Sequence, residues 1–276
     1  VSATVNGRGP YDFIIDTGAS HSLVFENLAN IHEFPPSGGE PQLVLGIASS
    51  AYYPTYSVGD IAIGPAALKD AATVIIADWT VGARAPQGVL GLDFLTQFRL
   101  LFDDKTRELI IYALDAPLPR TNEGWREAPL EGFEFDREAG EMYVISARLN
   151  RATVRFILDL GAAGTVINNL AYRRIREREP GLEIAIRPST RATGRIIDAL
   201  DTTVRTQAVR INSIRTNRIN WGGAVVVIHD AAIFAELGVD NEPFGLFGSD
   251  MFRDRSFVLD FSRNRVLVGP RTRRAG

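Results

Sequence analysis

The chain carries the same short motifs twice and in the same order, and this repetition limits the folds open to it. Residues 13–19 read FIIDTGA, and residues 156–162 read FILDLGA. Further along, residues 88–95 (GVLGLDFL) are matched by residues 245–252 (GLFGSDMF). A repeated order of motifs is typical of an internal duplication, in which each copy forms a similar structural unit.

The spacing of the motifs sets the boundaries of the two copies. The first motifs lie 143 residues apart and the second motifs 157, so the second copy holds about 14 more residues between its motifs. Residues 114–132 contain three prolines and few strand-forming residues, as is typical of a linker. We therefore predict two homologous lobes, 1–113 and 133–270, followed by a tail at 271–276.

Most apolar segments are short, rich in β-branched residues and separated by Gly, Pro, Asn or Asp. Examples are residues 11–16 (YDFIID), 153–159 (TVRFILD) and 224–228 (AVVVI). Helical periodicity is clear at residues 168–179, which Pro180 terminates, and weaker at residues 231–237. This pattern predicts an all-β protein with few short helices, built as barrels or sandwiches.

Composition excludes several classes of function. The chain of 276 residues has no cysteine, so disulfides, thiol nucleophiles and iron–sulfur clusters are ruled out. Its three histidines are widely separated, and we expect neither a metal site nor a cofactor. The net charge of −3 disfavours nucleic-acid binding, which normally requires a basic surplus. No apolar run approaches the ~18–20 residues of a membrane-spanning helix.

Both copies of the first motif place an aspartate after a run of apolar residues and before a glycine. Asp16 and Asp159 are thus delivered to the ends of buried strands, where an unpaired carboxylate would be costly. If a pseudo-twofold axis relates the lobes, the two carboxyl groups meet at that axis, share a proton and titrate as a pair. Such a pair supplies a general acid and a general base and can activate water without a covalent intermediate.

These motifs resemble those of the pepsin and retropepsin family of aspartic proteases. Residues 13–19 match the family's catalytic loop, and residues 89–91 and 246–248 match its apolar-apolar-Gly element. The resemblance covers nearly the whole chain. It implies two pseudo-twofold-related retropepsin-like β-barrel lobes with a cleft between them, as a retropepsin-like dimer fused into one polypeptide. We accordingly expect a monomer with an internal pseudo-dimer that cleaves a polypeptide substrate.

The resemblance also assigns roles to individual residues. Asp16 and Asp159 would form the catalytic dyad, and the residues that follow them would support the loops. Gly18 and Gly161 would let backbone N–H groups approach the carboxylates. In the family, the hydroxyl at the position of Thr17 grips the loop of the opposite lobe.

The second copy departs from the family at Leu160, which stands where Thr17 stands in the first copy. Leucine neither donates nor accepts a hydrogen bond, so half of the reciprocal hydroxyl network is missing. One lost hydrogen bond of this kind is worth about 1 kcal/mol. The sequence therefore leaves two functions open. One is an active aspartic endopeptidase, and the alternative is a catalytically impaired pseudo-protease that acts as a peptide-binding or regulatory module.

The resemblance further implies a flap, a hairpin that folds over the cleft between the two motifs of a lobe. We place its tip at residues 46–53 (GIASSAYY), with Ile47, Tyr52 and Tyr53 as candidates for substrate contact. The equivalent segment of the second lobe is predicted at residues 189–195 (STRATGR).

The expected cellular compartment rests on the resemblance alone. Duplicated single-chain proteins of this kind are similar to ones found in bacteria, which are often exported. We therefore expect a periplasmic or extracellular protein. The chain begins with Val1 a short distance before its first motif, and we expect that a leader has been removed.

Other polar residues have simpler interpretations. Asp103 and Asp260 end apolar strands without a following glycine, so we predict structural turns. Asp93 and Asp250 recur in the second motif and are predicted to cap helices. A serine nucleophile at Ser20 is not expected. The segment lacks a Gly-x-Ser-x-Gly elbow, and His21, as its neighbour on a strand, would point to the opposite face.

Overall fold

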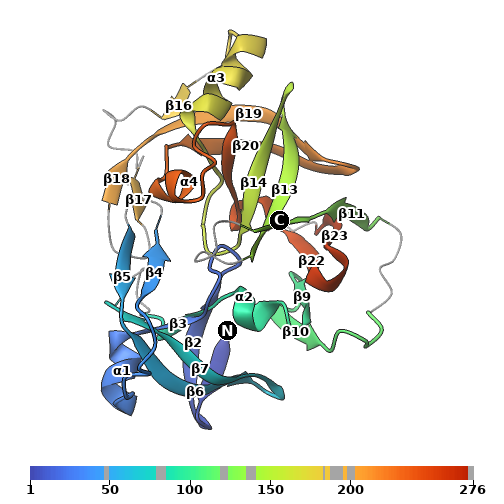
Figure 1. The fold of residues 1–276 in the computed structure, drawn as a ribbon. Helices are drawn as coiled ribbons and strands as arrows, with labels where there is room; N and C mark the ends of the chain where they lie inside the picture. The colour runs from blue at the N-terminus through green and yellow to red at the C-terminus, as the bar shows by residue number, and fades with distance from the viewer. Residues whose placement is uncertain are drawn as a thin grey trace.

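The computed structural model describes residues 1–46, 50–78, 85–118, 124–134, 141–182, 184–186, 195–197 and 203–272. It contains two closed six-stranded β-barrels and few short helices, as the sequence predicts. The first barrel lies at the bottom of Figure 1 and the second at the top. Within the described residues, no helix is both long enough and apolar enough to cross a membrane.

The first barrel combines short strands of three or four residues with longer strands of eight to eleven residues. Its order around the barrel is β1, β2, β8, β3, β7 and β6. The bounds of these strands are β1 Ser2–Val5, β2 Arg8–Ile15, β3 Leu23–Phe25, β6 Thr55–Ile63, β7 Ala66–Ile76 and β8 Gly88–Leu90.

The second barrel repeats this order, which is the structural counterpart of the motif repeat. It runs β13, β14, β21, β15, β20 and β19, and pairing between β13 and β19 closes it. Two further strands, β12 (Glu131–Glu134) and β16 (Ile184–Ile186), extend its sheet at the edges. The barrel strands are β13 Glu141–Leu149, β14 Ala152–Asp159, β15 Val166–Ile167, β19 Gln207–Thr216, β20 Ile219–Ile228 and β21 Phe244–Gly248.

A five-stranded sheet joins the lobes and was not predicted from the sequence. Its order is β10, β9, β22, β23 and β11, and we call it the interlobe sheet. The hairpin of β9 (Arg99–Asp103) and β10 (Glu108–Tyr112) comes from the first lobe, and that of β22 (Arg255–Asp260) and β23 (Arg265–Arg271) from the second. The segment predicted as a linker supplies the fifth strand, β11 (Arg126–Pro129), which pairs with β23.

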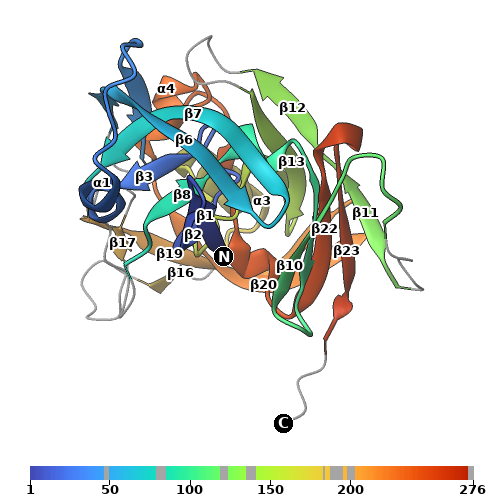
Figure 2. The same ribbon diagram turned by 90° about the horizontal axis from the view of Figure 1, so that it is seen from below.

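Two hairpins lie apart from the barrels. The first is formed by β4 (Gln42–Leu45) and β5 (Ser50–Tyr53), at the position predicted for the flap. The second is formed by β17 (Arg195–Ile197) and β18 (Thr203–Arg205). In both ribbon views the β4–β5 hairpin and the interlobe sheet lie on opposite sides of the molecule (Figures 1 and 2).

The helices are short apart from one. They are α1 Glu26–His32, α2 Leu92–Leu95, α3 Asn169–Arg178 and α4 Ala232–Glu236, with 3₁₀ turns at Ser249–Phe252 and Phe261–Arg263. Helices α3 and α4 are those expected from periodicity, and α3 begins where Asn168 accepts a hydrogen bond from the Ala171 amide at 2.8 Å.

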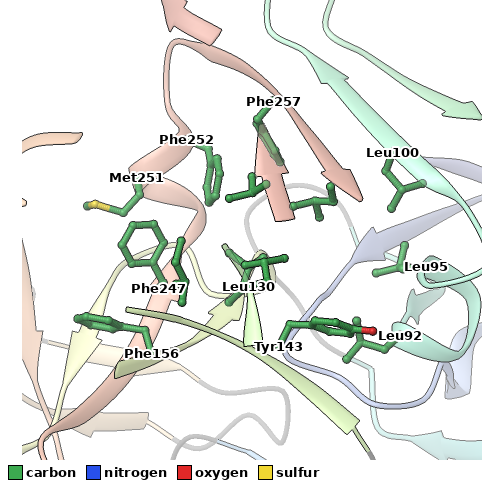
Figure 3. Packing of buried hydrophobic residues seen from close by; sticks show 14 of the residues in the cluster. Leu92, Leu95, Leu100, Leu130, Tyr143, Phe156, Phe247, Met251, Phe252 and Phe257 are labelled. Carbon is green, nitrogen blue, oxygen red and sulfur yellow. The ribbon is translucent and has the colours of Figure 1, made fainter. Parts of the chain in front are cut away.

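One continuous hydrophobic core runs through both lobes. The same buried cluster holds Leu92, Leu95 and Leu100 of the first lobe together with Leu130 of the linker segment and Tyr143 of the second lobe (Figure 3). Leu95 and Leu100 are fully buried. The lobes are therefore packed as one unit, which fixes the positions of the two aspartate-containing motifs relative to each other.

Candidate active site

The two motif aspartates occupy equivalent positions at the ends of central strands. Asp16 directly follows β2, and its amide donates to the Leu90 carbonyl of β8 at 3.0 Å. Asp159 ends β14 and pairs with Gly248 at the end of β21. In both lobes the aspartate strand runs parallel to the strand of the apolar-apolar-Gly motif. The repeated order of motifs thus becomes a repeated pair of parallel strands.

Each motif glycine faces the aspartate of the opposite lobe. A Cβ on Gly18 would lie 2.7 Å from the Cγ of Asp159. A Cβ on Gly161 would lie 2.4 Å from the Cγ of Asp16. No side chain fits at either position without displacing a carboxyl group, so the glycines are required by a close approach across the lobe boundary.

The carboxyl groups of Asp16 and Asp159 are hydrogen-bonded to each other. Asp159 is only 8 % exposed, and Asp16 is half-buried. Burial raises the pKa of Asp16, and burial together with the negative charge of Asp16 raises the pKa of Asp159 well above its ordinary value. Two acids this close cannot both ionise readily, so the pair retains one shared proton above the usual range for a carboxyl group.

Backbone amides hold each carboxyl group in place. The Gly18 amide donates to Oδ1 of Asp16 at 2.8 Å, and the Ala162 amide donates to Oδ1 of Asp159 at 2.8 Å. The nearby Gly161 amide also acts to lower the pKa of both carboxyl groups. These fixed donors favour the ionised forms and oppose the effect of burial.

Thr17 makes both of its hydroxyl contacts with the opposite lobe. Its Oγ1 donates to the Leu158 carbonyl at 2.7 Å and accepts from the Leu160 amide at 3.0 Å, in a fully buried position. Leu160 has no hydroxyl group that could make the equivalent contacts with the loop of the first lobe. Its half-buried side chain packs against the main hydrophobic cluster instead. The hydroxyl network between the loops is therefore one-sided.

A second pair of equivalent contacts, one in each lobe, supports the loops that follow Asp16 and Asp159. In the first lobe, Oδ1 of Asp93 accepts from the Ser22 amide at 2.9 Å and from the Ser22 hydroxyl at 2.7 Å. In the second lobe, Oδ1 of Asp250 accepts from the Thr165 hydroxyl at 2.8 Å.

The prediction that Asp93 and Asp250 cap helices is confirmed in part, because Oδ1 of Asp93 also accepts from the Phe94 amide in the first turn of α2 at 2.8 Å. The N-cap residue of each helical turn is a glycine, Gly91 or Gly248, so no side chain caps the turn from that position.

Ser22 and Thr165 are separated by the same 143 residues as the two motif aspartates. This equal spacing is the feature of the sequence from which the supporting role of the two hydroxyl residues could have been predicted.

The three residues predicted for the flap differ in what the structure describes of them. Ile47 lies outside the described residues, while Tyr52 on β5 is 63 % exposed. Tyr53 packs against a first-lobe cluster that contains Val74 and Ile76. Tyr53 therefore has a packing role, and Tyr52 is the described flap residue whose side chain faces solvent.

The β4–β5 hairpin reaches the second lobe. Leu45 packs against the cluster that contains Ile233 and Phe234 of α4, and the Ser50 hydroxyl donates to Oε1 of Glu236 at 3.5 Å. For the second lobe, residues 189–194 of the predicted flap lie outside the described residues. The described hairpin of that region, β17–β18, begins at Arg195, the last residue of the predicted segment.

Of the remaining predictions for polar residues, the one for the turn aspartates is confirmed and the one for Ser20 and His21 is wrong. Asp103 and Asp260 are structural turn residues, as predicted. Asp103 accepts from the Lys105 amide and Asp260 from the Ser262 hydroxyl. The expectation that Ser20 and His21 point apart is wrong, since Oγ and Nδ1 lie 3.0 Å apart on an exposed bend outside any strand.

Among the described residues, no group of three or more His, Asp or Glu side chains is placed to hold a metal ion. Around the acid pair at the lobe boundary, the amides of Gly18 and Ala162 act as hydrogen-bond donors. Its chemistry is that of two carboxyl groups that exchange a proton.

Comparison with known families gives an independent result for the first lobe. Residues 1–94 match the family model described as aspartyl protease. A search of curated proteins found no significant match. The first lobe is thus similar to aspartyl proteases, and the matched region includes Asp16, Thr17 and Gly18.

Proposed function

We propose that the protein is an aspartic endopeptidase whose catalytic dyad is Asp16 and Asp159. The observation that carries the proposal is the approach of these two carboxyl groups across the lobe boundary, each delivered by an equivalent strand of its own lobe and packed against the motif glycine of the other. The match of residues 1–94 to the aspartyl protease family supports the reaction class, and a polypeptide is the corresponding substrate.

The mechanism follows from the shared proton. The ionised carboxylate accepts a proton from a water molecule as the water oxygen attacks the carbonyl carbon of the peptide. The protonated carboxyl group hydrogen-bonds to the carbonyl oxygen and stabilises the tetrahedral intermediate. The C–N bond then breaks while the leaving nitrogen receives a proton, and the dyad returns to its singly protonated state. No covalent intermediate with the enzyme forms.

The loops prepare this geometry before substrate binds. Backbone donors from Gly18 and Ala162 fix one oxygen of each carboxyl group, and Thr17 ties the two loops together. Preorganised donors of this kind require no reorganisation during the reaction, which is the source of much enzymatic rate enhancement.

The test is cleavage of an unfolded polypeptide by the purified chain at mildly acidic pH. Asp16→Asn and Asp159→Asn should each abolish cleavage, because an amide cannot accept the proton of the attacking water. Asp115→Asn is the matched control, since Asp115 is exposed and lies outside the loops. Cleavage that persists unchanged in Asp16→Asn would rule out the assignment.

The one-sided hydroxyl network favours a second candidate, a pseudo-protease that binds peptides without turnover. Leu160 lacks the group that would make the loop contacts reciprocal. Under this alternative the unmodified protein binds a statine-type inhibitor but cleaves nothing between about pH 3 and pH 7, and Leu160→Thr restores cleavage. Robust cleavage by the unmodified protein eliminates the alternative.

A further inference from the structure

A pocket at one end of the second barrel is lined mainly by arginines. It lies where the turn between β13 and β14 meets the end of α3 and the end of β19. The turn and α3 are at the top of Figure 1, on the side of the second lobe that faces away from the first. The pocket has a volume of about 580 Å³, and its arginines are Arg148, Arg151, Arg178 and Arg215.

The equivalent end of the first barrel has the same strand pairing without these charges. In the second lobe, Arg148 of β13 pairs with Arg215 of β19. In the first lobe, the corresponding pair between β1 and β6 is Thr4 and Ala62. One barrel end thus forms with small uncharged residues at both positions, so the fold itself does not require the arginines.

An asparagine in the hairpin turn supports this end of both barrels. Asn6 and Asn150 both adopt positive φ. The Asn6 amide donates to the Asp60 carbonyl at 2.9 Å, and the Asn150 amide donates to the Ser213 carbonyl at 2.7 Å. Ser213 therefore stands where the first lobe has a carboxylate, and Arg151 follows the asparagine where the first lobe has a glycine. The second barrel end has lost an acidic residue as well as gained basic ones.

The arginines of the pocket are not neutralised by acidic side chains. Among the described residues, none of the four forms an ion pair. The pocket is also lined by Glu179, but its carboxylate accepts from Nδ2 of Asn150 at 2.5 Å. Arg148 and Arg215 lie directly opposite each other, where like charges destabilise a sheet. An anion bound between them would offset this repulsion.

Backbone carbonyls hold two of the guanidinium groups at the pocket. Nε of Arg148 donates to the Asn150 carbonyl at 3.1 Å, and a terminal nitrogen of Arg178 donates to the Arg151 carbonyl at 2.6 Å. A guanidinium group has five N–H donors, so each retains donors for a ligand. Arg178 also complements the dipole at the end of α3, but this accounts for none of the arginines on the barrel.

We propose that this pocket binds a phosphate group, carried either by a soluble phosphorylated compound or by a lipid headgroup. Guanidinium groups bind phosphate oxygens through pairs of parallel hydrogen bonds, and they remain charged at any physiological pH. A terminal phosphate carries a charge of about −1.5 to −2 and three acceptor oxygens, so it can contact several arginines at once. The site faces away from the acid pair and does not depend on peptidase activity.

The first probe is tripolyphosphate, titrated calorimetrically into the complete protein at low ionic strength, because salt screens exposed charges. We expect saturable binding with a Kd below about 1 mM. Arg148→Thr combined with Arg215→Ala gives the second barrel the residues of the first and should weaken binding at least about tenfold. The matched control is Arg210→Gln combined with Arg218→Gln, which removes two exposed arginines of the β19–β20 hairpin outside the pocket. The control should bind within about twofold of the unmodified protein.

Two further measurements separate a lost site from a lost fold. Without ligand, the Arg148→Thr, Arg215→Ala variant should unfold at no lower temperature than the unmodified protein, since the repulsion between the paired strands is gone. Tripolyphosphate should raise the Tm of the unmodified protein but not that of this variant. In the unmodified protein it should also shift the amide NMR resonances of residues 148–151 and 213–215, a measurement that involves no variant.

Vesicles distinguish the two sources of the phosphate group. Phosphatidylcholine vesicles that contain phosphatidic acid should capture the protein if a lipid headgroup is the ligand, and vesicles of phosphatidylcholine alone should not. Capture should be lost in the Arg148→Thr, Arg215→Ala variant and kept in the control. Binding of tripolyphosphate without capture by vesicles assigns the site to a soluble compound.

Several results would overturn the proposal. They are the absence of saturable binding of both probes, an equal loss of affinity in the pocket variant and the control, and resonance shifts confined to residues outside the pocket. Citrate that binds as tightly as tripolyphosphate would overturn it as well, by showing that the arginines do not select phosphate over carboxylate.

Discussion

Gly161 of the second lobe lies so close to Asp16 of the first that a Cβ there would be 2.4 Å from the carboxyl carbon. Replacing Gly161 with alanine should therefore push the Asp16 carboxyl group away from Asp159 and separate the acid pair. We expect loss of at least about 99 % of any peptidase activity, since small misplacements of catalytic groups cost two orders of magnitude in rate. Cleavage of an unfolded polypeptide provides the measurement.

The matched control is Gly164→Ala in the same loop. A Cβ on Gly164 would meet no atom within 4 Å, and its φ is not in the left-handed region. This variant should retain activity and stability. If the two alanine variants behaved alike, the close packing of Gly161 on Asp16 would have no functional consequence.

Thr17 links the two lobes through a buried hydroxyl, so its removal should affect stability before chemistry is considered. Thr17→Val keeps the shape of the side chain but leaves the Leu158 carbonyl and the Leu160 amide without this partner. We expect the free energy of unfolding to fall by about 2–3 kcal/mol. Urea denaturation measures the change, and Thr17→Ser, which keeps the hydroxyl, should lose markedly less.

The buried carboxylate Asp260 holds the interlobe sheet together through Arg265. Asp260 is fully buried, and it accepts from Nε and one terminal nitrogen of Arg265, each at 3.1 Å. Arg265→Met should leave this carboxylate without its cation and lower the free energy of unfolding by about 3 kcal/mol. Arg263→Met on the neighbouring turn is the control, and an equal loss there would show that the ion pair is not the cause.

The sequence was sufficient to predict the two lobes and the pairing of their aspartates, because both follow from repeated local patterns. An apolar run followed by Asp and Gly dictates a buried strand that ends in a carboxylate, and its recurrence implies symmetry. Ser22 and Thr165 also recur, but a hydroxyl that braces a loop has no distinctive local pattern. The expected export of the protein stays a prediction.

The interlobe sheet could not be predicted from the sequence for a different reason. Residues 126–129 (REAP) contain a proline and two charged residues, which is weak evidence for a strand. They form β11 because the edge of β23 offers hydrogen-bond partners and an apolar surface for Ala128. Tertiary context thus overrides local propensity in the segment that the sequence marks as a linker.

The raised pKa of Asp159 makes stability depend on pH. Below the ordinary carboxyl range, folded and unfolded chains both hold the proton. As pH rises, the unfolded chain releases it first, so the folded state binds more protons and the free energy of unfolding falls until the folded pKa is passed.

Asp159→Asn removes this effect, and its amide oxygen can still accept from Ala162. The variant should therefore be more stable than the unmodified protein at about pH 7 and nearly equal to it at about pH 3. Thermal unfolding at the two pH values measures the difference, with Asp115→Asn as control. If the variant and the unmodified protein were equally stable at both pH values, the pKa of Asp159 in the folded state would not be raised above that of an ordinary carboxyl group.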